Sequence, residues 1–355
     1  MKIKVHSGEL SRIMKTVTRC LDSKTPSRAN IEISHVDDRL RIRGTNGIFQ
    51  AEMSTPLADG DGESFCVDGA MFAKVISTCR GMVDIVTDQR SCVVKSTGRT
   101  RIQLVECTVP AMPEISGESV EIRAEDFKAC YSRVSYAVAM DQSRIVLTGI
   151  LTETDGSVMK MVALDGFQMA MDSVPCLGDS VRMVIPGAFM DLLSSAVESS
   201  QKITLITDGK RIQASTGDAT LSCSLIAGEY IDYGKILPEN FATETIVKTE
   251  NVVDALKSGS IVNSKQRLVR VDVSDTNLKI MSNSEEADYE ANIDCDTHGD
   301  GLKIGFNDRY LMNAMNALKA DEAILKFNTP VSPVVIQGKD ENGIHLCLPV
   351  RTMGA

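Results

Sequence analysis

The segment VDIVTDQRSCVVKSTG, residues 83–98, returns in altered form as ITLITDGKRIQASTG at residues 203–217. Both segments hold Thr-Asp followed by Ser-Thr-Gly, and the two copies lie about 119 residues apart. Leu40-Arg41-Ile42 is echoed two periods later by Leu278-Lys279-Ile280, which indicates a third copy. Solenoid units run roughly 20 to 50 residues, so a period this long corresponds to a whole domain. The chain is therefore expected to contain three copies of one domain.

Each copy is predicted to open with a short strand and an amphipathic helix. In the first copy, Ser7 is expected to cap a helix that reaches about Leu21. Apolar residues recur at the helical spacing of about 3.6 residues and predict the buried helix faces. These faces comprise Leu10, Ile13, Met14, Val17 and Leu21 in the first copy, Phe127, Tyr131, Val134 and Val138 in the second, and Val252 and Leu256 in the third.

A second helix is expected near the middle of each copy, led in turn by Asp68, Pro186 and Asn307. Around the helices lie segments in which apolar and polar residues alternate, such as 83–86 and 324–327, and these predict strands. The predicted fold class is therefore α+β, with two helices packed on roughly eight antiparallel strands in each copy. The expected domains are residues 1–116, 117–240 and 241–355.

The bulk composition is that of an ordinary globular protein. Hydrophobic residues make up 43% and charged residues 24% of the chain, and no run approaches the roughly 18 apolar residues of a membrane span. The N-terminal residues lack the apolar stretch of a signal peptide, so the ten cysteines are expected to be reduced thiols in a cytoplasmic protein. No metal or cofactor is predicted, because the four histidines are scattered and have no partner at ligand spacing.

Positive charge gathers on the predicted helices although the net charge of the chain is −10. An ordinary solvated face would explain each helix taken alone. The same bias in all three copies instead favours a basic surface that binds phosphate backbones without reading bases, although the middle helix of the second copy carries Asp191 and Glu198. The helix residues predicted to face DNA are Arg12, Lys15, Arg19, Lys74, Arg80, Lys128, Arg133 and Lys257.

Motifs of the common enzyme classes are missing from the sequence. It contains no Gly-rich phosphate loop ending in Lys-Ser/Thr, no His-Glu-x-x-His and no Gly-x-Ser-x-Gly. Two alternatives to DNA binding stay open. One is an α+β enzyme with an active site around Asp165-Gly166 at a domain junction, and the other is a repeat-built scaffold that never encloses DNA.

Short motifs spread in order over the whole chain carry a family resemblance. They are residues 96–101 leading to Pro110-Ala111-Met112-Pro113, Leu147-Thr148-Gly149-Ile150-Leu151, Asp165-Gly166, residues 229–238, Ile304-Gly305-Phe306-Asn307, Asn316-Ala317-Leu318 and Leu348-Pro349-Val350-Arg351. In the order and spacing of these motifs, the chain resembles the bacterial sliding clamps, which are the beta subunits of the DNA polymerase III holoenzyme. The resemblance implies a non-catalytic processivity factor, a head-to-tail homodimer whose two three-domain chains close a six-domain ring around duplex DNA.

The resemblance also implies partners and the residues that contact them. A cleft between domains two and three is expected to receive a short, partly hydrophobic peptide from the replicative polymerase, the clamp loader or other replication and repair proteins, in the cytoplasm and at the nucleoid. The expected lining is Leu147, Leu164, Gly166, Phe167, Gln168, Met169, Ile231, Lys235, Ile236, Pro333, Leu346, Leu348, Pro349, Val350 and Arg351. The dimer interface is expected to join Ile102 and Leu104 of one chain to Ile261 and Val262 of the other, and Lys24 is expected to contact the duplex.

Several positions depart from better-known members of the family. Leu164 stands where threonine is often found, and Phe167 and Gln168 stand where histidine and arginine are frequent. The cleft is therefore expected to be more apolar and less basic than usual. Ile145 and Val146 replace aromatic residues in a loop that contacts DNA in the family.

Overall fold

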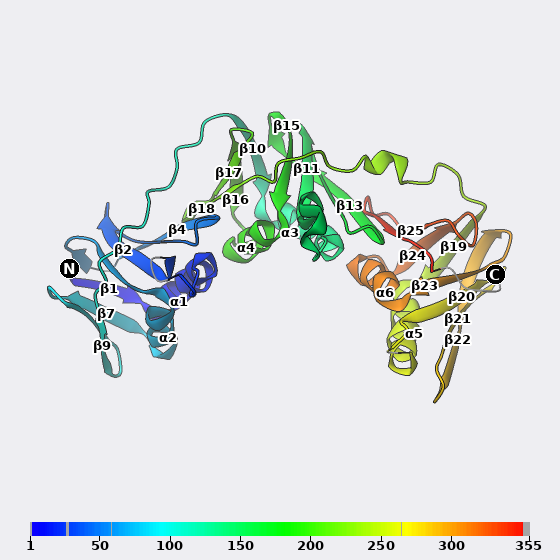
Figure 1. Cartoon of the computed structure of the whole chain (residues 1–355), viewed down its shortest axis with the longest axis horizontal. Helices are drawn as coiled ribbons and strands as arrows, with labels where there is room; N and C mark the ends of the chain where they lie inside the picture. The colour runs from blue at the N-terminus through cyan, green and yellow to red at the C-terminus, as the bar shows by residue number, and fades with distance from the viewer. Residues whose placement is uncertain (1, 26–27, 58, 264, 351–355) are drawn as a thin grey trace. The chain divides into compact units, whose positions relative to one another are not determined.

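The structure is a computed structural model that describes residues 2–25, 28–57, 59–263 and 265–350, and within them the order of elements recurs three times (Figure 1). The first copy consists of β1 (Lys2–His6), α1 (Ser7–Val17), η1 (Thr18–Cys20), β2 (Asn30–Val36), β3 (Arg39–Thr45), β4 (Phe49–Pro56), β5 (Asp59–Asp61), β6 (Phe65–Asp68), α2 (Gly69–Thr78), β7 (Met82–Thr87), β8 (Ser91–Lys95) and β9 (Arg99–Gln103). The second consists of β10 (Glu118–Arg123), α3 (Ala124–Val134), η3 (Ser135–Ala137), η4 (Gln142–Thr148), β11 (Gly149–Asp155), β12 (Val158–Leu164), β13 (Gln168–Pro175), β14 (Leu177–Gly178), β15 (Ser180–Pro186), α4 (Gly187–Ala196), β16 (Lys202–Thr207), β17 (Arg211–Ser215), β18 (Ala219–Ser224) and η5 (Tyr233–Lys235). The third consists of β19 (Thr243–Lys248), α5 (Thr249–Val262), β20 (Leu268–Val273), β21 (Asn277–Asn283), β22 (Asp288–Gly299), β23 (Leu302–Asn307), α6 (Asp308–Ala317), β24 (Glu322–Phe327), β25 (Val334–Gly338) and β26 (Ile344–Cys347).

Backbone contacts divide the chain into two compact units, and the second copy contributes to both. The first unit holds the chain up to Phe127 with Cys176–Ser180 and Ala188–Leu225. The second holds Lys128–Pro175, Val181–Gly187 and the chain from Ile226 onward. No helix in the described part of the chain is long and apolar enough to cross a membrane.

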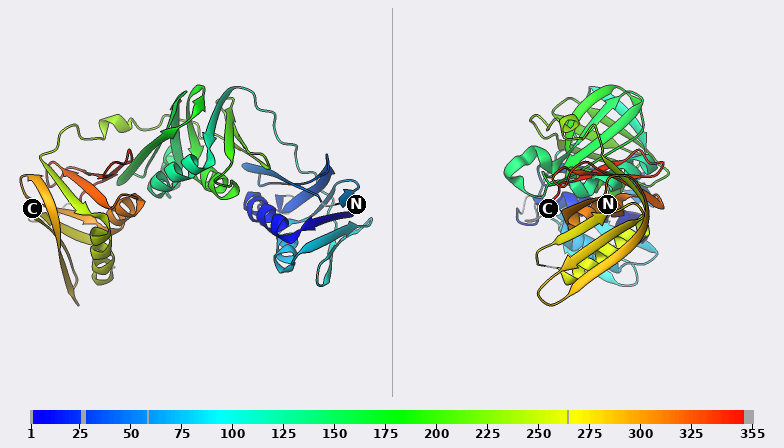
Figure 2. Two further views of the ribbon diagram at one scale, coloured as in Figure 1. Left: turned by 180° about the vertical axis from the view of Figure 1, so that it is seen from behind. Right: turned by 90° about the vertical axis from the view of Figure 1, so that its right-hand side faces the viewer.

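The first unit contains two antiparallel sheets. One has the order β5-β1-β7-β8-β9, and the other has the order β14-β10-β16-β17-β18-β4-β3-β2-β6. In the second sheet a strand of the first copy, β4, pairs with a strand of the second copy, β18, with Ala51 opposite Leu221. An ion pair of 2.6 Å between Arg39 Nη2 and Asp218 Oδ1 lies beside this pairing. The helices α1 and α2 pack side by side (Figures 1 and 2).

The second unit repeats this arrangement one copy further along the chain. Its strands have the order β15-β11-β12-β13-β26-β25-β24-β19-β22-β21-β20-β23. Here β13 of the second copy pairs with β26 of the third, with Met169 opposite Leu346. In the third copy the first half of the long β22 pairs with β21 and its second half pairs with β19. This single strand takes the place of two consecutive shorter strands in the other copies, which are β4 and β5 in the first copy and β13 and β14 in the second.

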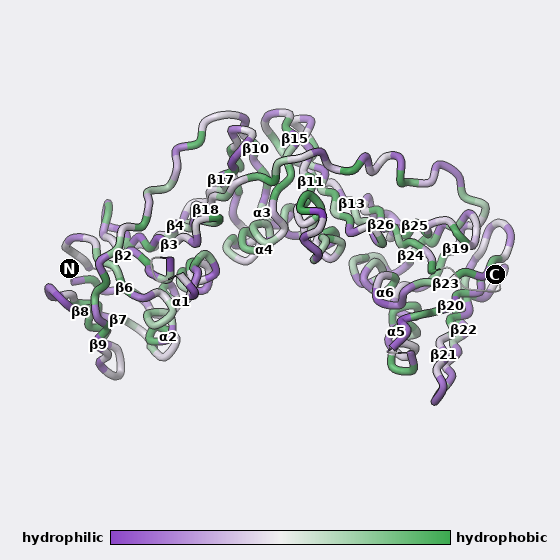
Figure 3. The backbone as a smooth tube through the Cα atoms, in the orientation of Figure 1, coloured by the Kyte–Doolittle hydropathy of each residue, from purple (hydrophilic) through white to green (hydrophobic). Residues whose placement is uncertain are grey.

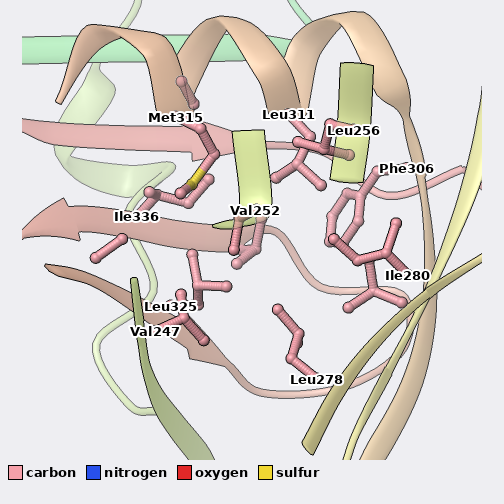
Figure 4. Packing of buried hydrophobic residues seen from close by; sticks show 14 of the residues in the cluster. Val247, Val252, Leu256, Leu278, Ile280, Phe306, Leu311, Met315, Leu325 and Ile336 are labelled. Atoms are coloured by element: carbon pink, nitrogen blue, oxygen red, sulfur yellow. The ribbon is translucent and has the colours of Figure 1, made fainter. Parts of the chain in front are cut away.

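The core of the third copy forms where α5 and α6 pack together against their sheets (Figure 4). Leu256 from α5 and Leu311 and Met315 from α6 are almost fully buried there with Phe306 of β23. Gly259 allows α5 to approach β21 closely, because an added Cβ would lie 2.7 Å from Ser282 Oγ. Hydrophilic and hydrophobic residues alternate along the chain trace (Figure 3), as expected for helices and strands with one buried face.

The predicted apolar stripe of the first helix is confirmed for its first four members, which are buried. Two details were wrong. The helix is capped by His6, whose side chain accepts a hydrogen bond from Gly8 N, and Ser7 is its first residue. The α-helix ends at Val17, so Leu21 lies beyond it.

The residues predicted to lead the middle helices cap them in two copies. Asp68 accepts a hydrogen bond of 2.6 Å from Met71 N, and Asn307 accepts one of 3.0 Å from Arg309 N. Pro186 ends β15 directly before α4. All ten cysteines are free thiols, as predicted.

Candidate partner-binding and DNA-facing surfaces

The turn between β12 and β13 shapes the predicted cleft. Asp165 Oδ1 accepts hydrogen bonds from the backbone N–H groups of Phe167 at 2.8 Å and Gln168 at 2.9 Å. Gly166 has a φ of +97°, a conformation that favours glycine. Because the Asp165 carboxylate is occupied in holding the turn, the geometry offers no support for a catalytic role at Asp165-Gly166.

Most of the apolar residues predicted for the cleft lie in one cluster of the second unit. Leu147, Leu164, Met169 and Leu346 are buried in this cluster, and Ile231, Ile236 and Leu348 pack against it while staying partly exposed. A peptide that reached this surface would therefore touch the three partly exposed side chains directly. The four buried residues would support them from beneath.

The backbone after β26 crosses the cluster in an extended form. Leu348 N donates to the Phe167 carbonyl oxygen at 2.9 Å, and Val350 N donates to the Gly305 carbonyl oxygen at 2.8 Å. Between them, Pro349 forms an isolated bridge with Phe306. The predicted lining residues 348–350 are thus fixed between the β12–β13 turn and β23. Arg351 lies outside the described residues.

An aromatic pair flanks the same turn. The rings of Phe167 and Tyr310 are stacked with centroids 5.7 Å apart and an interplanar angle of 10°. Phe167 is 58% exposed, so its outer face is available to a partner. Burial raises the pKa of the Tyr310 hydroxyl, which therefore stays neutral. The pair joins β13 and its turn from the second copy to α6 of the third.

Gln168 does not offer its amide to a partner, contrary to its predicted place in the lining. The side chain is buried, and its Nε2 donates to Asp165 Oδ2 at 2.9 Å and to the Tyr136 carbonyl oxygen at 3.3 Å. Its Oε1 accepts from Asn313 Nδ2 at 3.4 Å. Both polar atoms of the Gln168 amide therefore already have hydrogen-bond partners within the chain. Because these partners belong to the second and third copies, Gln168 links the two copies.

The remaining predicted lining residues lie at the surface. Lys235, at the end of η5, is exposed and forms an ion pair of 3.0 Å with Asp232, the residue before η5. Pro333 is partly buried just before β25. This part of the expected cleft is thus solvated, in contrast to the apolar cluster.

Two polar side-chain pairs lie in the second unit, and sequence reasoning missed both pairings. Arg133 Nε lies 2.5 Å from Asp172 Oδ2, and the Asp172 side chain is 1% exposed. The Tyr136 hydroxyl lies 3.0 Å from His345 Nδ1. The sequence of β26 carries no local signal that pairs His345 with Tyr136, 209 positions away.

Apart from half-buried Lys128, the predicted DNA-facing residues fall into two groups. Lys15, Lys24 and Lys74 are exposed and form no ion pair in the part of the chain that the structure describes. The other group has intramolecular partners. Arg12 pairs with Glu9 at 3.1 Å and Lys257 with Asp254 at 3.3 Å.

Arginines near helix ends are also engaged within the chain. Arg19 Nη2 lies 2.5 Å from Asp191 Oδ2, so the acidic residue of the second copy's middle helix neutralises a residue of the first copy. Arg80 donates to the carbonyl oxygens of Ser77 and Cys79 at the end of α2. Lys128 is half-buried. Arg133 does not belong to a free basic face, because its guanidinium is held by buried Asp172.

The predicted dimer residues lie at two separate places. Ile102 is buried in β9, which ends its sheet. Leu104 lies just after β9, and its N–H donates to the carbonyl oxygen of Arg90 at 2.9 Å. Ile261 is 80% exposed near the end of α5, beside half-buried Val262. A large exposed aliphatic side chain of this kind is a feature of interaction surfaces.

Comparison with known proteins gives matches over the whole chain. The curated beta sliding clamps of Vibrio cholerae and Escherichia coli K12 are 22% and 25% identical to it, and each alignment covers 99% of this chain and 100% of the relative. A crystal structure of the DNA polymerase III beta subunit of Thermotoga maritima matches with a TM-score of 0.92 at 21% identity, covering 99% of both chains. A Pseudomonas aeruginosa sliding clamp bound to griselimycin matches with a TM-score of 0.93 at 20% identity, covering 99% of this chain and 100% of that one.

Two family profiles match consecutive parts of the sequence. The central domain of the DNA polymerase III beta subunit matches residues 121–232, and its C-terminal domain matches residues 234–351. Together these ranges span more than half of the 355 residues. With its threefold order of elements and its full-length relatives, the chain belongs to the family of DNA polymerase III beta subunits, the bacterial beta sliding clamps.

Proposed function

We propose that two copies of this chain close head to tail into a ring of six domains that encircles duplex DNA and tethers replication proteins to it. The family is one of non-catalytic processivity factors, and the chain acts as a DNA sliding clamp. The domains proposed are 1–116, 117–240 and 241–355, and the two profile matches begin close to the second and third of them. The site of action proposed is the cytoplasm, at the nucleoid.

The ring is inferred from strand pairing between copies of the domain. Such a pairing joins the first copy to the second and the second to the third, but no third pairing of this kind occurs among the described residues. β4 of the first copy pairs with β18 of the second, and β13 of the second pairs with β26 of the third. β18 and β26 are the last strands of their copies, and the last strand of the first copy is β9. By the same rule, the first half of β22 in the third copy would pair with a β9 strand. Among the described residues this half of β22 pairs only with β21, and β9 pairs only with β8. Each chain thus has two complementary open edges, and a second copy would cover both.

The charges on these two edges are complementary. Arg99 and Arg101 are exposed on β9, while Asp288 and Glu290 are exposed on β22. Opposite charges across an interface favour the correct partner and orientation. Ile261 and Val262 at the end of α5 would add apolar contact beside this seam, since α5 packs on β21 and β22.

DNA would be held loosely and without regard to sequence. Lys15, Lys24 and Lys74 are the side chains best suited to phosphate, because they are exposed and carry no ion pair in the described residues. With a Debye length of about 8 Å at physiological salt, contacts across a wet gap would be weak. A closed ring does not need tight contacts, because tethering raises the local concentration of the polymerase by topology alone.

The proposed partner site is the surface formed by Ile231, Ile236, Leu348 and the outer face of Phe167. Apolar side chains supply most of the affinity in peptide grooves, with a few polar groups at the rim. The replicative polymerase, the clamp loader and other replication and repair proteins would each present a short hydrophobic segment here. The chain lacks the basic residue often found at position 168, and Gln168 is occupied internally. The site would therefore discriminate by shape and apolar contact.

Retention on DNA of defined topology tests the ring directly. The purified dimer would be loaded onto nicked circular DNA by its clamp loader, and the complex would be isolated by gel filtration. The ring should stay with the circle and leave when a restriction enzyme linearises the DNA. Equal retention on both forms would show ordinary DNA binding, and a monomer indifferent to topology would exclude the clamp.

A further inference from the structure

Two cysteine side chains meet beside the edge strand β6, in a pocket whose lining also includes Leu104 of the proposed dimer edge. The Cys66 thiol on β6 donates to the carbonyl oxygen of Cys107 at 3.3 Å. Val105 N donates to the Cys66 carbonyl oxygen at 2.9 Å, which holds the segment after β9 along β6. Burial, and after it the hydrogen bond with the Cys107 side chain, raise the pKa of the Cys66 thiol to about 12. The two thiols are therefore neighbours in space although 41 positions apart.

The two thiols differ in their access to solvent. A pocket of about 880 Å³ is lined by both cysteines together with Arg43 and Arg90. Cys66 is only 8% exposed, whereas Cys107 is half-buried. A small polar oxidant that enters the pocket would thus reach Cys107 first, with Cys66 directly behind it.

We propose that Cys66 and Cys107 are a modification site, a thiol pair that hydrogen peroxide oxidises to an intramolecular disulfide. The Cys107 sulfur attacks one peroxide oxygen, the O–O bond breaks, and water leaves, so that Cys107 becomes a sulfenic acid. The Cys66 sulfur then attacks the sulfenic sulfur, the S–O bond breaks, and the hydroxyl leaves as a second water with the Cys66 proton. The two thiols lose two electrons and two protons, and the peroxide is reduced to two waters.

The burial of Cys66 is consistent with a reaction in which peroxide oxidises Cys107 first and Cys66 reacts second. A protonated, buried Cys66 is a poor target for peroxide in solution, because the thiolate is the reactive form. It attacks the Cys107 sulfenic acid because that group is held beside it and its leaving hydroxyl takes the Cys66 proton. The disulfide is neutral and carries no thiol proton, so its burial leaves no charge unsolvated. Oxidation would tie β6 covalently to the segment that follows Leu104. The chemistry takes place within one chain, so it stands independently of the ring.

A second close pair of thiols provides an internal control. Burial is the main cause of the raised pKa of Cys223, and the neighbouring Cys20 raises it further. Both are almost fully buried, at 0% and 3% exposure. Proximity alone would therefore oxidise either pair, whereas access through the pocket selects Cys66 and Cys107.

The test uses the full-length protein and hydrogen peroxide. After exposure, free thiols are blocked with N-ethylmaleimide and peptides are mapped by non-reducing mass spectrometry. We expect two of the ten thiols to be lost and one linked species to join the peptides of Cys66 and Cys107. A linkage between Cys20 and Cys223, or retention of all ten thiols, would overturn the proposal.

Variants separate the two steps. Cys66→Ser should stop the reaction at the Cys107 sulfenic acid, which dimedone traps as an adduct. Cys107→Ser should leave Cys66 as a free thiol, because peroxide no longer has an accessible first target. The matched control is Cys295→Ser, which replaces another partly exposed thiol and should leave the disulfide unchanged. An unmodified Cys107 in the Cys66→Ser variant would also count against the proposal.

Discussion

The Tyr136 hydroxyl lies 3.0 Å from His345 Nδ1, and this contact joins η3 of the second copy to β26 of the third. The two rings are also stacked, with centroids 5.9 Å apart. His345 Nε2 is buried and has no hydrogen-bond partner among the described residues. Burial lowers the pKa of His345 to about 4, and the charge of Arg133 lowers it further in the same direction. The imidazole is therefore neutral in the folded protein at neutral pH.

The stability of the protein should fall as the pH is lowered from about 6.5 towards 4. In this window the unfolded chain, with an ordinary histidine pKa of 6.5, binds a proton that folded His345 with its pKa of about 4 does not. Since the unfolded state binds more protons, the free energy of unfolding decreases with decreasing pH, by at most about 3 kcal/mol from this group. Urea unfolding at a series of pH values measures the slope.

The matched variant is His345→Phe, which keeps an aromatic ring and removes the titrating group. Its stability should vary less between pH 4.5 and 7 than that of the natural protein, whatever its absolute value. Parallel curves for the two proteins would show that His345 is not the group responsible.

Breaking the ion pair between Arg133 and Asp172 should be costly. Arg133→Met leaves the carboxylate of Asp172, whose side chain is 1% exposed, without its cationic partner. An unpaired buried charge destabilises a fold by about 3–5 kcal/mol. Chemical denaturation should show a loss of this size for Arg133→Met. The double variant Arg133→Met/Asp172→Leu should regain most of it, and a double variant as unstable as the single one would contradict this account.

Leu348→Ala should weaken the binding of a clamp-binding peptide and leave the dimer intact. Leu348 is partly exposed and packs on the buried cluster, so it is in a position to contact a peptide. Met169→Ala should also weaken binding, but it creates a cavity at a residue only 1% exposed and should cost about 2–5 kcal/mol of stability. Fluorescence anisotropy with a labelled peptide from the polymerase subunit, alongside thermal unfolding, distinguishes the two effects. Unchanged affinity in Leu348→Ala would mean that the peptide binds elsewhere.

The sequence predicts local features well and distant pairings poorly. The first four residues of the apolar stripe on α1 and the helix starts at Asp68 and Asn307 depend on nearby residues, and these predictions were confirmed. Ser7 was mistaken for a cap because serine is a common capping residue, while the Nδ1 atom of His6 performs that role here. The pairing of Gln168 with Asn313 depends on two copies coming together, and neither residue carries a local signal for it.

The same distinction applies to the basic residues. Helical spacing predicts an outward position for Arg19, which lies in η1 just after α1, but its partner Asp191 is 172 positions away. The family resemblance predicts which positions line the cleft, but it does not predict which of them are exposed. Only the packing separates those that are partly exposed, such as Leu348, from those that are buried, such as Leu346.

Removing an unpaired lysine should lower the salt dependence of DNA binding. Each phosphate contact releases counterions, so Lys15→Ala or Lys74→Ala should reduce the slope of log K against log salt by about 1. Arg133→Met should leave the slope unchanged, since Asp172 already neutralises that guanidinium. Anisotropy of a short labelled duplex at several salt concentrations gives the slopes. A loss of slope in Arg133→Met equal to that in Lys15→Ala would contradict the division of basic residues into two groups.

Reversing the charges on one strand edge should dissociate the dimer, and reversing both edges should restore it. Arg99→Glu/Arg101→Glu would place negative charge on β9, which in the proposed ring lies opposite the exposed acidic residues Asp288 and Glu290 of β22 in the second chain. The hydrogen bond from Lys279 lowers the pKa of Glu290, so this residue stays negative at neutral pH. Sedimentation equilibrium should show a weaker dimer for Arg99→Glu/Arg101→Glu, and recovery when Asp288→Arg/Glu290→Arg is added. At 1 M salt the Debye length is about 3 Å, so the differences should shrink. A quadruple variant no more dimeric than the double one would mean that β9 and β22 do not meet.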